Sequence, residues 1–271
     1  MGKKIRPALF FLSQGLAGRS PGVVEAAVAL ELIHAASLIH DDVVDGAAIR
    51  RGGSSLNGRF GERLSVLVGD CVWARALGIA LEVPLDGFMP LISRTATAMS
   101  RGELASTAAA GKMVSLNAYL DAVADKTASL FETACVSGGM AASASEATLE
   151  RLRAFGRAFG MRFQFHDDLS DFLGVAEGKP SGLDACGGRA TLPLILAWEH
   201  AEEYERNAVA GLMPSDRHWD AARLRAWTED HGGVDRAKRL MQSESDRAAG
   251  ILDAFPDSAY RQALRELVED I

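Results

Sequence analysis

The sequence has few cysteines, no excess of positive charge and no uninterrupted apolar run of membrane-spanning length. Its three cysteines, Cys71, Cys135 and Cys186, are far apart and odd in number, so neither a disulfide framework nor a zinc site is predicted. A reducing compartment is favoured. The formal net charge of -7 argues against a general nucleic-acid binder. Without a run of roughly 20 apolar residues, no integral membrane segment is expected.

The N-terminus has some features of a targeting signal. The segment MGKKIRPALFFL has the positive start and apolar continuation of a signal peptide, but the apolar part is short and is interrupted from Ser13 onward. Arg6 stands where a myristoylation motif has Ser or Thr. Because no strong signal is found, a cytoplasmic location is expected.

The chain is rich in apolar residues at helical spacing. A 48% share of hydrophobic residues in 271 allows a large buried core. No strand alternation and no hairpin signal is evident between the periodic runs. An all-α fold in a single domain over 1–271 is therefore predicted, with long helices over 23–40, 64–81, 89–110, 115–142, 147–173 and 190–209.

The motif DDxxD occurs twice, beginning at Asp41 and at Asp167. Residues four apart share a helix face, so Asp41 and Asp45 point the same way, as do Asp167 and Asp171. Like charges at that spacing repel, which calls for a positive partner. Magnesium prefers oxygen ligands, takes one or two carboxylates from protein, and fills its other positions with water and phosphate. Two such clusters facing each other would hold several magnesium ions around one diphosphate.

A solvated acidic face is the alternative for either cluster taken alone. Both copies, however, are embedded in apolar helices, as Leu38, Ile39, Val43 and Val44 illustrate for the first. Such flanks favour a helix that faces a core or cavity, where unpaired carboxylates are costly.

Further polar side chains fall beside the acidic motifs. His34 lies seven residues before Asp41, and Gln164 lies four before Asp168. Arginine suits phosphate because its planar fork donates two hydrogen bonds at once. A satisfied core histidine and ordinary surface charges are the alternatives for single residues. The candidate phosphate-binding cations are Lys3, Lys4, Arg6, Arg50, Arg51, Lys126 and Lys179.

The order of these motifs resembles the trans-isoprenyl diphosphate synthase (polyprenyl synthetase) family, of the long-chain type. The resemblance covers nearly the whole chain, and it implies a helical bundle around a central cavity. The segments that carry it are GKKIRP at 2–7, HAASLIHDDVVD at 34–45, RRGG at 50–53, LVGD at 67–70, DKTASLFE at 125–132, FQFHDDLSD at 163–171, GKPSGLD at 178–184 and GRATLPLI at 188–195.

The resemblance also implies a role for each matching residue. Magnesium ligands would be Asp41, Asp45, Asp167, Asp168 and Asp171. Contacts to the allylic diphosphate would come from Arg50, Lys126, Thr127, Gln164, Lys179 and Arg189. The diphosphate of isopentenyl diphosphate would be bound by Lys3, Arg6, His34 and Arg51.

The implied reaction is a head-to-tail condensation. Several magnesium ions and the cationic side chains would draw charge from the allylic C1–O bond until diphosphate leaves. The double bond of isopentenyl diphosphate would then attack the allylic cation, giving a trans product five carbons longer. The departing diphosphate would serve as the base, so no general-base side chain is expected.

Two residues bear on product length. In this family the positions four and five before the first aspartate floor the product cavity, and here they are Ser37 and Ala36. Both are small, where short-chain producers commonly place an aromatic ring that blocks growth by its volume. A product longer than farnesyl diphosphate is predicted.

Several features depart from the family pattern. The first helices, which contribute to the dimer in relatives, and the basic C-terminal tail are apparently missing. Arg189 stands where Lys is usual, Ser106 where Gln is frequent, and Ser170 where Leu is common. A homodimer is expected, with weak or partner-dependent activity as a further possibility.

Three other readings compete with a synthase. A class I terpene cyclase usually keeps one DDxxD, whereas this chain has two and adds basic motifs for a second diphosphate. A non-catalytic subunit of a heteromeric synthase often loses aspartates that this chain retains. A plain helical scaffold would not explain the ordered basic motifs. Magnesium-dependent binding of a diphosphate separates the scaffold from the enzymes.

Overall fold

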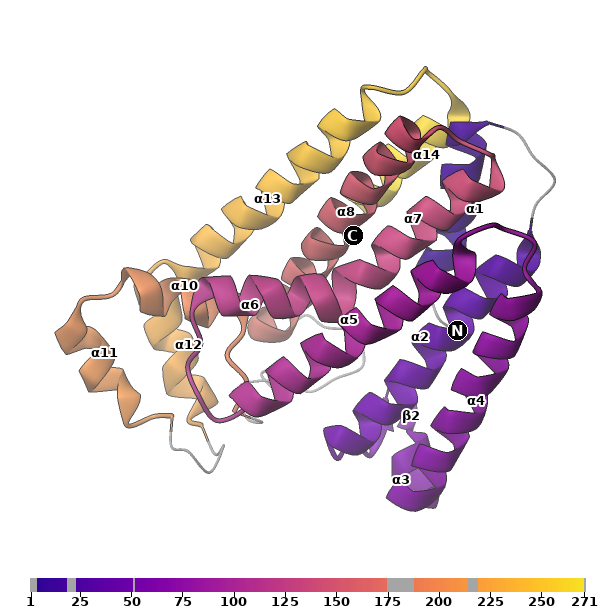
Figure 1. Cartoon of the computed structure of the whole chain (residues 1–271). Helices are drawn as coiled ribbons and strands as arrows, with labels where there is room; N and C mark the ends of the chain where they lie inside the picture. The colour runs from indigo at the N-terminus through magenta and orange to yellow at the C-terminus, as the bar shows by residue number, and fades with distance from the viewer. Residues whose placement is uncertain (1–3, 19–22, 51, 175–187, 214–218, 271) are drawn as a thin grey trace. The chain divides into compact units, whose positions relative to one another are not determined.

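The computed structural model describes residues 4–18, 23–50, 52–174, 188–213 and 219–270, which are mostly helical (Figure 1). The predicted all-α class is confirmed. Contacts group the chain into two compact units, the first comprising 1–96, 129–157 and 249–270, and the second 97–128 and 158–248. The boundaries between them fall within helices α5 (Phe88–Ala109), α8 (Glu146–Leu173) and α13 (Gly233–Leu252), and between Ala128 and Ser129. One domain over the whole chain stays a prediction.

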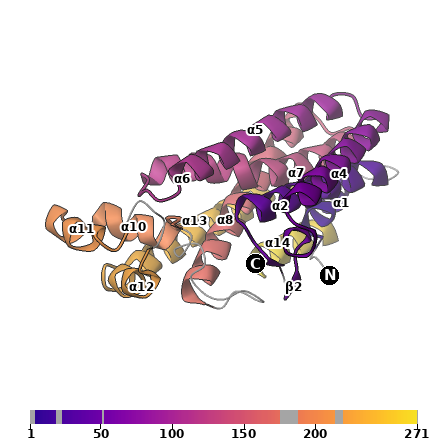
Figure 2. The ribbon, with the colours of Figure 1, turned by 90° about the horizontal axis from the view of Figure 1, so that it is seen from below.

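Two helix pairs organise the first unit. Helix α1 (Ile5–Ala17) packs against α7 (Ser129–Ala141), and α2 (Val24–Val44) runs beside α4 (Glu62–Glu82) in both views (Figures 1 and 2). Helix α14 (Ala259–Glu269) also contacts α1. Large apolar side chains fill this unit because they alternate at helical spacing on facing helices. Its largest fully buried side chains include Phe10, Leu30, Ile33, Phe88, Ile92, Phe131, Leu152 and Phe155.

A short hairpin follows α2, contrary to the prediction that strands are absent. Strands β1 (Ile49–Arg50) and β2 (Gly53–Ser54) pair antiparallel, and Gly52 has a φ of 74°, a conformation that glycine adopts without strain. Two-residue strands carry too little alternation to be read from sequence. Ser55 then caps the short helix α3 (Leu56–Phe60) through its side-chain oxygen.

The second unit contains a helix that changes its winding. Residues 115–142 were predicted as one helix, but α6 (Leu116–Val123) passes into one π-helical turn, η1 (Ala124–Ala128), before α7 begins. A π turn inserts an extra residue and is frequent at functional sites. It lies within the DKTASLFE motif.

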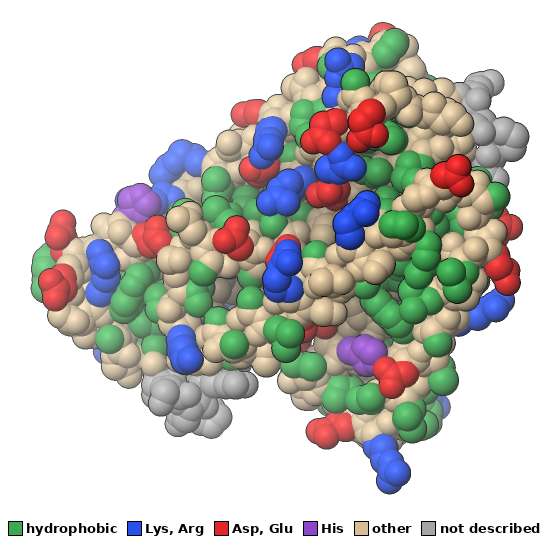
Figure 3. Space-filling model, in the orientation of Figure 1, with side chains coloured by type: hydrophobic (Ala, Val, Ile, Leu, Met, Phe, Trp, Pro, Cys, Tyr) green, Lys and Arg blue, Asp and Glu red, His purple; other side chains and the backbone are tan. Residues whose placement is uncertain are grey.

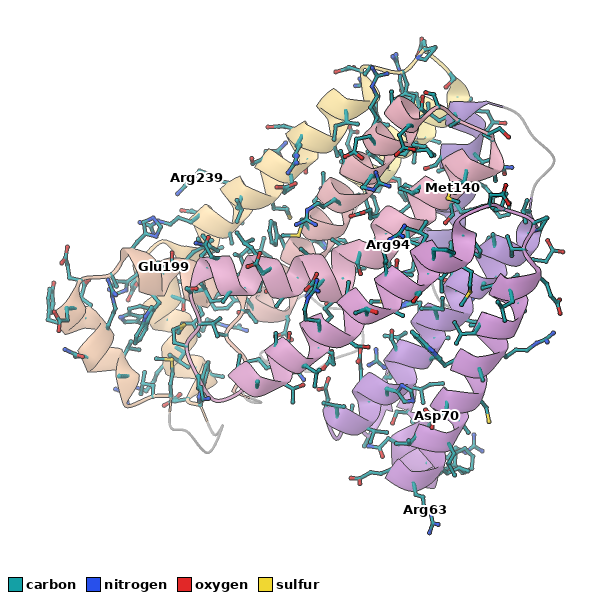
Figure 4. All side chains as sticks on the ribbon, viewed as in Figure 1. Arg63, Asp70, Arg94, Met140, Glu199 and Arg239 are labelled. Carbon is teal, nitrogen blue, oxygen red and sulfur yellow. The ribbon has the colours of Figure 1, made fainter. Side chains whose placement is uncertain are left out.

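Short helices complete the second unit. The predicted helix over 190–209 is divided into α10 (Leu192–His200) and α11 (Glu203–Ala210), because the side chain of Glu202 caps a new helix start. Helix α12 (Ala221–Asp230) packs on α10. The carboxylate of Glu199, labelled in Figure 4, accepts a hydrogen bond of 2.6 Å from the backbone N–H of Leu116 at the start of α6.

Helix α4 is apolar yet mostly exposed. By length and composition it could cross a membrane, with a mean hydropathy of 1.6, but only 22% of that stretch is buried. The expectation that the chain has no apolar segment of this length was therefore wrong on length and composition. The segment was missed because Asp70 and Arg75 interrupt its apolar residues. Hydrophobic side chains reach the surface over this helix (Figure 3), while its charged Arg63 and Asp70 are labelled in Figure 4. Leu64 and Leu67 are 45% and 55% exposed.

Candidate functional site

The first DDxxD motif ends helix α2. The helix runs to Val44, and the N–H of Asp45 bonds the carbonyl of Asp41 at 2.8 Å, so the two residues are one turn apart at the helix end. Asp41 is half-buried and Asp45 is exposed. Two carboxylates on one face are a donor set that fits a hard divalent cation.

The middle aspartate of this motif has a different environment. Asp42 is 4% exposed, and its Oδ1 accepts a hydrogen bond from Nε of Arg50 at 2.6 Å. Its backbone carbonyl accepts a further bond from the Asn57 amide at 3.2 Å. Asp42 therefore anchors the hairpin to the end of α2, a role that the motif letters did not reveal. The predicted contact between Arg50 and diphosphate remains a prediction.

Only some of the residues predicted to bind isopentenyl diphosphate lie in the part of the chain that the structure describes. Arg6 is buried, with its guanidinium carbon 4.3 Å from the centre of the Phe131 ring, a cation–π contact. His34 lies half-buried on α2. Neither position tests diphosphate binding. Lys3 and Arg51 lie outside the described residues.

The second DDxxD motif lies at the end of α8. Asp167 is exposed, while Asp168 and Asp171 are buried. Asp168 accepts hydrogen bonds from the Tyr119 hydroxyl at 2.7 Å, the Leu192 backbone N–H at 2.9 Å and the Gln164 amide at 2.8 Å. The three aspartates, which the family resemblance treats alike, therefore differ sharply in exposure and partners.

The π turn η1 brings Lys126 and Thr127 to the same unit as this motif. The Thr127 hydroxyl donates to Oε1 of Gln164 at 2.9 Å. The Lys126 ammonium forms an ion pair with Glu103 of α5. Gly102 permits this close approach, because a Cβ there would lie 2.5 Å from the backbone nitrogen of Lys126.

A cavity of about 200 Å³ opens in the second unit. Alanines of α5 and α6 form much of its wall, and polar groups line the rest. Ser106, which departs from the family pattern expected from the sequence, is one of the lining residues. Lys179 lies outside the described residues. The predicted allylic-site residues that line the cavity are Lys126, Thr127, Gln164 and Arg189, together with Asp168.

No described cluster forms a complete metal cage. Among the residues that the structure describes, no three His, Cys, Asp or Glu side chains are grouped to hold an ion. Magnesium takes only one or two protein carboxylates, so the Asp41 and Asp45 pair still suits it. Cys135 is a poor metal ligand, because burial raises the pKa of its thiol to about 12.

The two predicted floor residues differ in their surroundings. Ala36 is fully buried, with no exposed surface. Ser37 is half-buried, and its hydroxyl donates to the carbonyl of His34 at 2.9 Å within α2. Only Ser37 therefore retains exposed surface that a larger side chain could extend into.

Comparisons with known proteins agree with the motif order. A sequence model described as polyprenyl synthetase matches residues 1–228. Heptaprenyl diphosphate synthase component 2 of Geobacillus stearothermophilus is 33% identical over 98% of this chain and 84% of its own.

Solved structures give the same picture. A polyprenyl synthase of Caulobacter crescentus CB15, complexed with calcium and isoprenyl diphosphate, is 32% identical with a TM-score of 0.92, covering 99% of this chain and 84% of that one. A decaprenyl diphosphate synthase of Rhodobacter capsulatus is 31% identical with a TM-score of 0.93, covering 100% and 85%.

Proposed function

This chain belongs to the polyprenyl synthetase family, and from that membership we propose that it condenses isopentenyl diphosphate with an allylic diphosphate. The product is a trans-polyprenyl diphosphate five carbons longer at each step. The observation that carries the proposal is the Asp41 and Asp45 pair at the end of α2, in a chain whose second DDxxD adjoins a cavity with Lys126 and Arg189.

Each side chain has a chemical task in this proposal. Asp41 and Asp45, together with Asp167 and Asp171, would hold magnesium through carboxylate oxygens. When bound, magnesium withdraws charge from the allylic diphosphate so that its C1–O bond can ionise.

The cationic side chains act on the same leaving group. Lys126 and Arg189, both lining the cavity, would bind diphosphate oxygens and stabilise the negative charge that develops on them. A lysine in an ion pair is already fixed in position, so the contact of Lys126 with Glu103 orients the ammonium before substrate arrives. The alanines of the cavity wall keep water away from an allylic cation.

The product is proposed to be longer than farnesyl diphosphate. The side chains of Ala36 and Ser37 at the floor positions are too small to block a growing product chain sterically. The names of the heptaprenyl and decaprenyl relatives support the same proposal.

The exposed face of α4 is proposed to pair with a second copy of the chain. Leu64, Val66 and Leu67 leave a patch of large apolar side chains exposed to water on α4, which is costly for a monomer. A second copy would cover the same surface on both partners. A monomer that bound phospholipid vesicles would contradict this assignment.

A synthase of more than one component is the second candidate. The Geobacillus relative is named component 2, which favours a subunit that needs a partner. In that case the isolated chain would bind magnesium and allylic diphosphate but would not elongate it.

The decisive test of the proposal is incorporation of labelled isopentenyl diphosphate. We expect purified chain, farnesyl diphosphate and magnesium to yield labelled lipid, and EDTA to abolish it. The exposed Asp86→Asn variant, far from both motifs along the sequence, is the matched control and should keep wild-type activity. Binding without elongation would support the second candidate, and cyclic hydrocarbon would identify a cyclase.

A further inference from the structure

We propose that Tyr119 and Asp168 form a positioning relay that orients Gln164 and Thr127 for catalysis, an inference that rests on the proposed function. The relay lies wholly within the second unit. It runs from the Tyr119 hydroxyl to Asp168, then to the Gln164 amide, and ends at the Thr127 hydroxyl beside the cavity.

The Asp168 carboxylate is engaged by protein donors. Oδ2 accepts from the Tyr119 hydroxyl at 2.7 Å and from the Leu192 N–H at 2.9 Å, while Oδ1 accepts from Gln164 at 2.8 Å. A carboxylate offers about four lone-pair sites, so most of this one is used. Asp168 is 4% exposed, whereas Asp167 beside it is exposed. The structure thus assigns Asp168 to positioning rather than to metal ligation.

The donors and acceptors fix the direction of every bond in the relay. An ionised carboxylate only accepts, so the Gln164 side chain must turn its NH₂ group toward Asp168. Its Oε1 then faces Thr127, and the Thr127 hydroxyl must donate to it. Thr127 consequently presents its lone pairs, not its proton, to other neighbours. In this arrangement it does not donate to a diphosphate oxygen, contrary to the contact that the family resemblance implied.

Burial makes the relay rigid. Tyr119 is 8% exposed, and its ring stacks on Phe165 with centroids 6.3 Å apart. The hydroxyl thereby reaches Asp168 from α6, while Leu192 reaches it from the start of α10. Partners of this kind orient the groups that touch substrate, and a misplacement of about 1 Å can cost about 100-fold in rate.

The first test removes a single oxygen. We expect Tyr119→Phe to lower kcat about tenfold, because the ring and its packing remain while the hydrogen bond to Asp168 is lost. The matched control is Tyr204→Phe, whose side chain is 71% exposed on α11 and which should keep wild-type kcat. The magnesium concentration for half-maximal activity should not change. A clear rise in it for Tyr119→Phe would overturn the assignment.

A double-mutant cycle separates a relay from a general packing role. If Tyr119 acts through Thr127, the pair Tyr119→Phe and Thr127→Val should be no slower than Thr127→Val alone. Rate losses that multiply would overturn the relay. If Tyr119→Phe does not fold, as judged by thermal unfolding, Asp168→Asn takes its place in the same cycle.

Wild-type chain measured in parallel keeps the two proposals apart. Elongation by the wild type with independent rate losses in the variants overturns the relay alone. A wild type that elongates no primer overturns the proposed function and the relay together.

Discussion

At the scale of single residues, four of the six aspartates in the DDxxD motifs show two contrasting environments. Asp42 and Asp168 are buried and hydrogen-bonded to other side chains, whereas Asp45 and Asp167 are exposed. Buried carboxylates with protein donors are held in place by those bonds, while the exposed ones face solvent, where a cation can reach them. Aspartates of the same motif thus have different roles, some holding other side chains in place and some proposed to bind a metal ion.

Replacing Asp45 tests the ligation half of this division. We expect Asp45→Asn to lose about 100-fold in kcat/KM and to need more magnesium, because one carboxylate ligand is gone. Initial rates across a magnesium titration measure both effects. Unchanged magnesium dependence in this variant would contradict the role of Asp45 as a ligand.

Product length should respond to Ser37 more cleanly than to Ala36. We expect Ser37→Phe to shorten the product, because the half-buried position leaves room for a ring that blocks the growing chain. Ala36→Phe instead overfills a fully buried site, at a cost of about 1–3 kcal/mol in unfolding free energy. Chromatography of the products checks the chain length made by Ser37→Phe, and urea unfolding checks the stability of Ala36→Phe. Full-length product from stable Ser37→Phe would rule out this floor.

The sequence predicted residue identities better than residue environments. The i, i+4 spacing of Asp41 and Asp45 at the end of α2 follows from helix geometry, so it was predictable. The contacts of Asp168 with Tyr119 and Leu192 join residues 49 and 24 positions apart. Pairings over such separations depend on the packed fold and leave no local pattern.

At the scale of helices, the close approach of α5 to η1 depends on one glycine. We expect Gly102→Ala to destabilise the fold by about 1–3 kcal/mol and to slow turnover, because the added Cβ pushes on Lys126. Gly250→Ala on α13 is the control, since its Cβ would meet open space and should stabilise the helix by up to about 1 kcal/mol. Wild-type stability and rate in Gly102→Ala would refute the steric argument.

The exposed face of α4 yields a prediction about assembly. We expect the wild type to sediment as a dimer and Leu67→Glu to sediment as a monomer, because a buried unpaired charge opposes association. Tyr204→Glu, at a still more exposed position on α11, should remain dimeric. A Leu67→Glu chain with the mass of the wild type would exclude this face as the interface.

Helix existence was easier to predict than helix boundaries and winding. The periods over 23–40, 64–81, 89–110 and 147–173 correspond to α2, α4, α5 and α8. Periodicity could not reveal the π turn η1, because one inserted residue hardly changes the apolar pattern. The exposure of α4 was also missed, because the apolar pattern of a helix is the same whether its own chain or another molecule covers it.

At the scale of the whole molecule, the family and fold follow from motifs that are in the right order along nearly the entire chain. Order of this kind is specific because several separate motifs must occur in the same sequence along one chain. Product length depends instead on the volume at the cavity floor, oligomeric state on a second copy of the chain, and catalytic competence on bound ions. These properties are tested in solution.

The most direct test is the length of the products. Wild-type chain is incubated with magnesium, labelled isopentenyl diphosphate and, separately, dimethylallyl, geranyl, farnesyl and geranylgeranyl diphosphates, and the dephosphorylated products are separated by size. We expect a ladder in five-carbon steps that extends beyond twenty carbons. A ladder that stops at fifteen or twenty carbons would contradict the small-floor prediction, and folded protein that elongates no primer would contradict the proposed function.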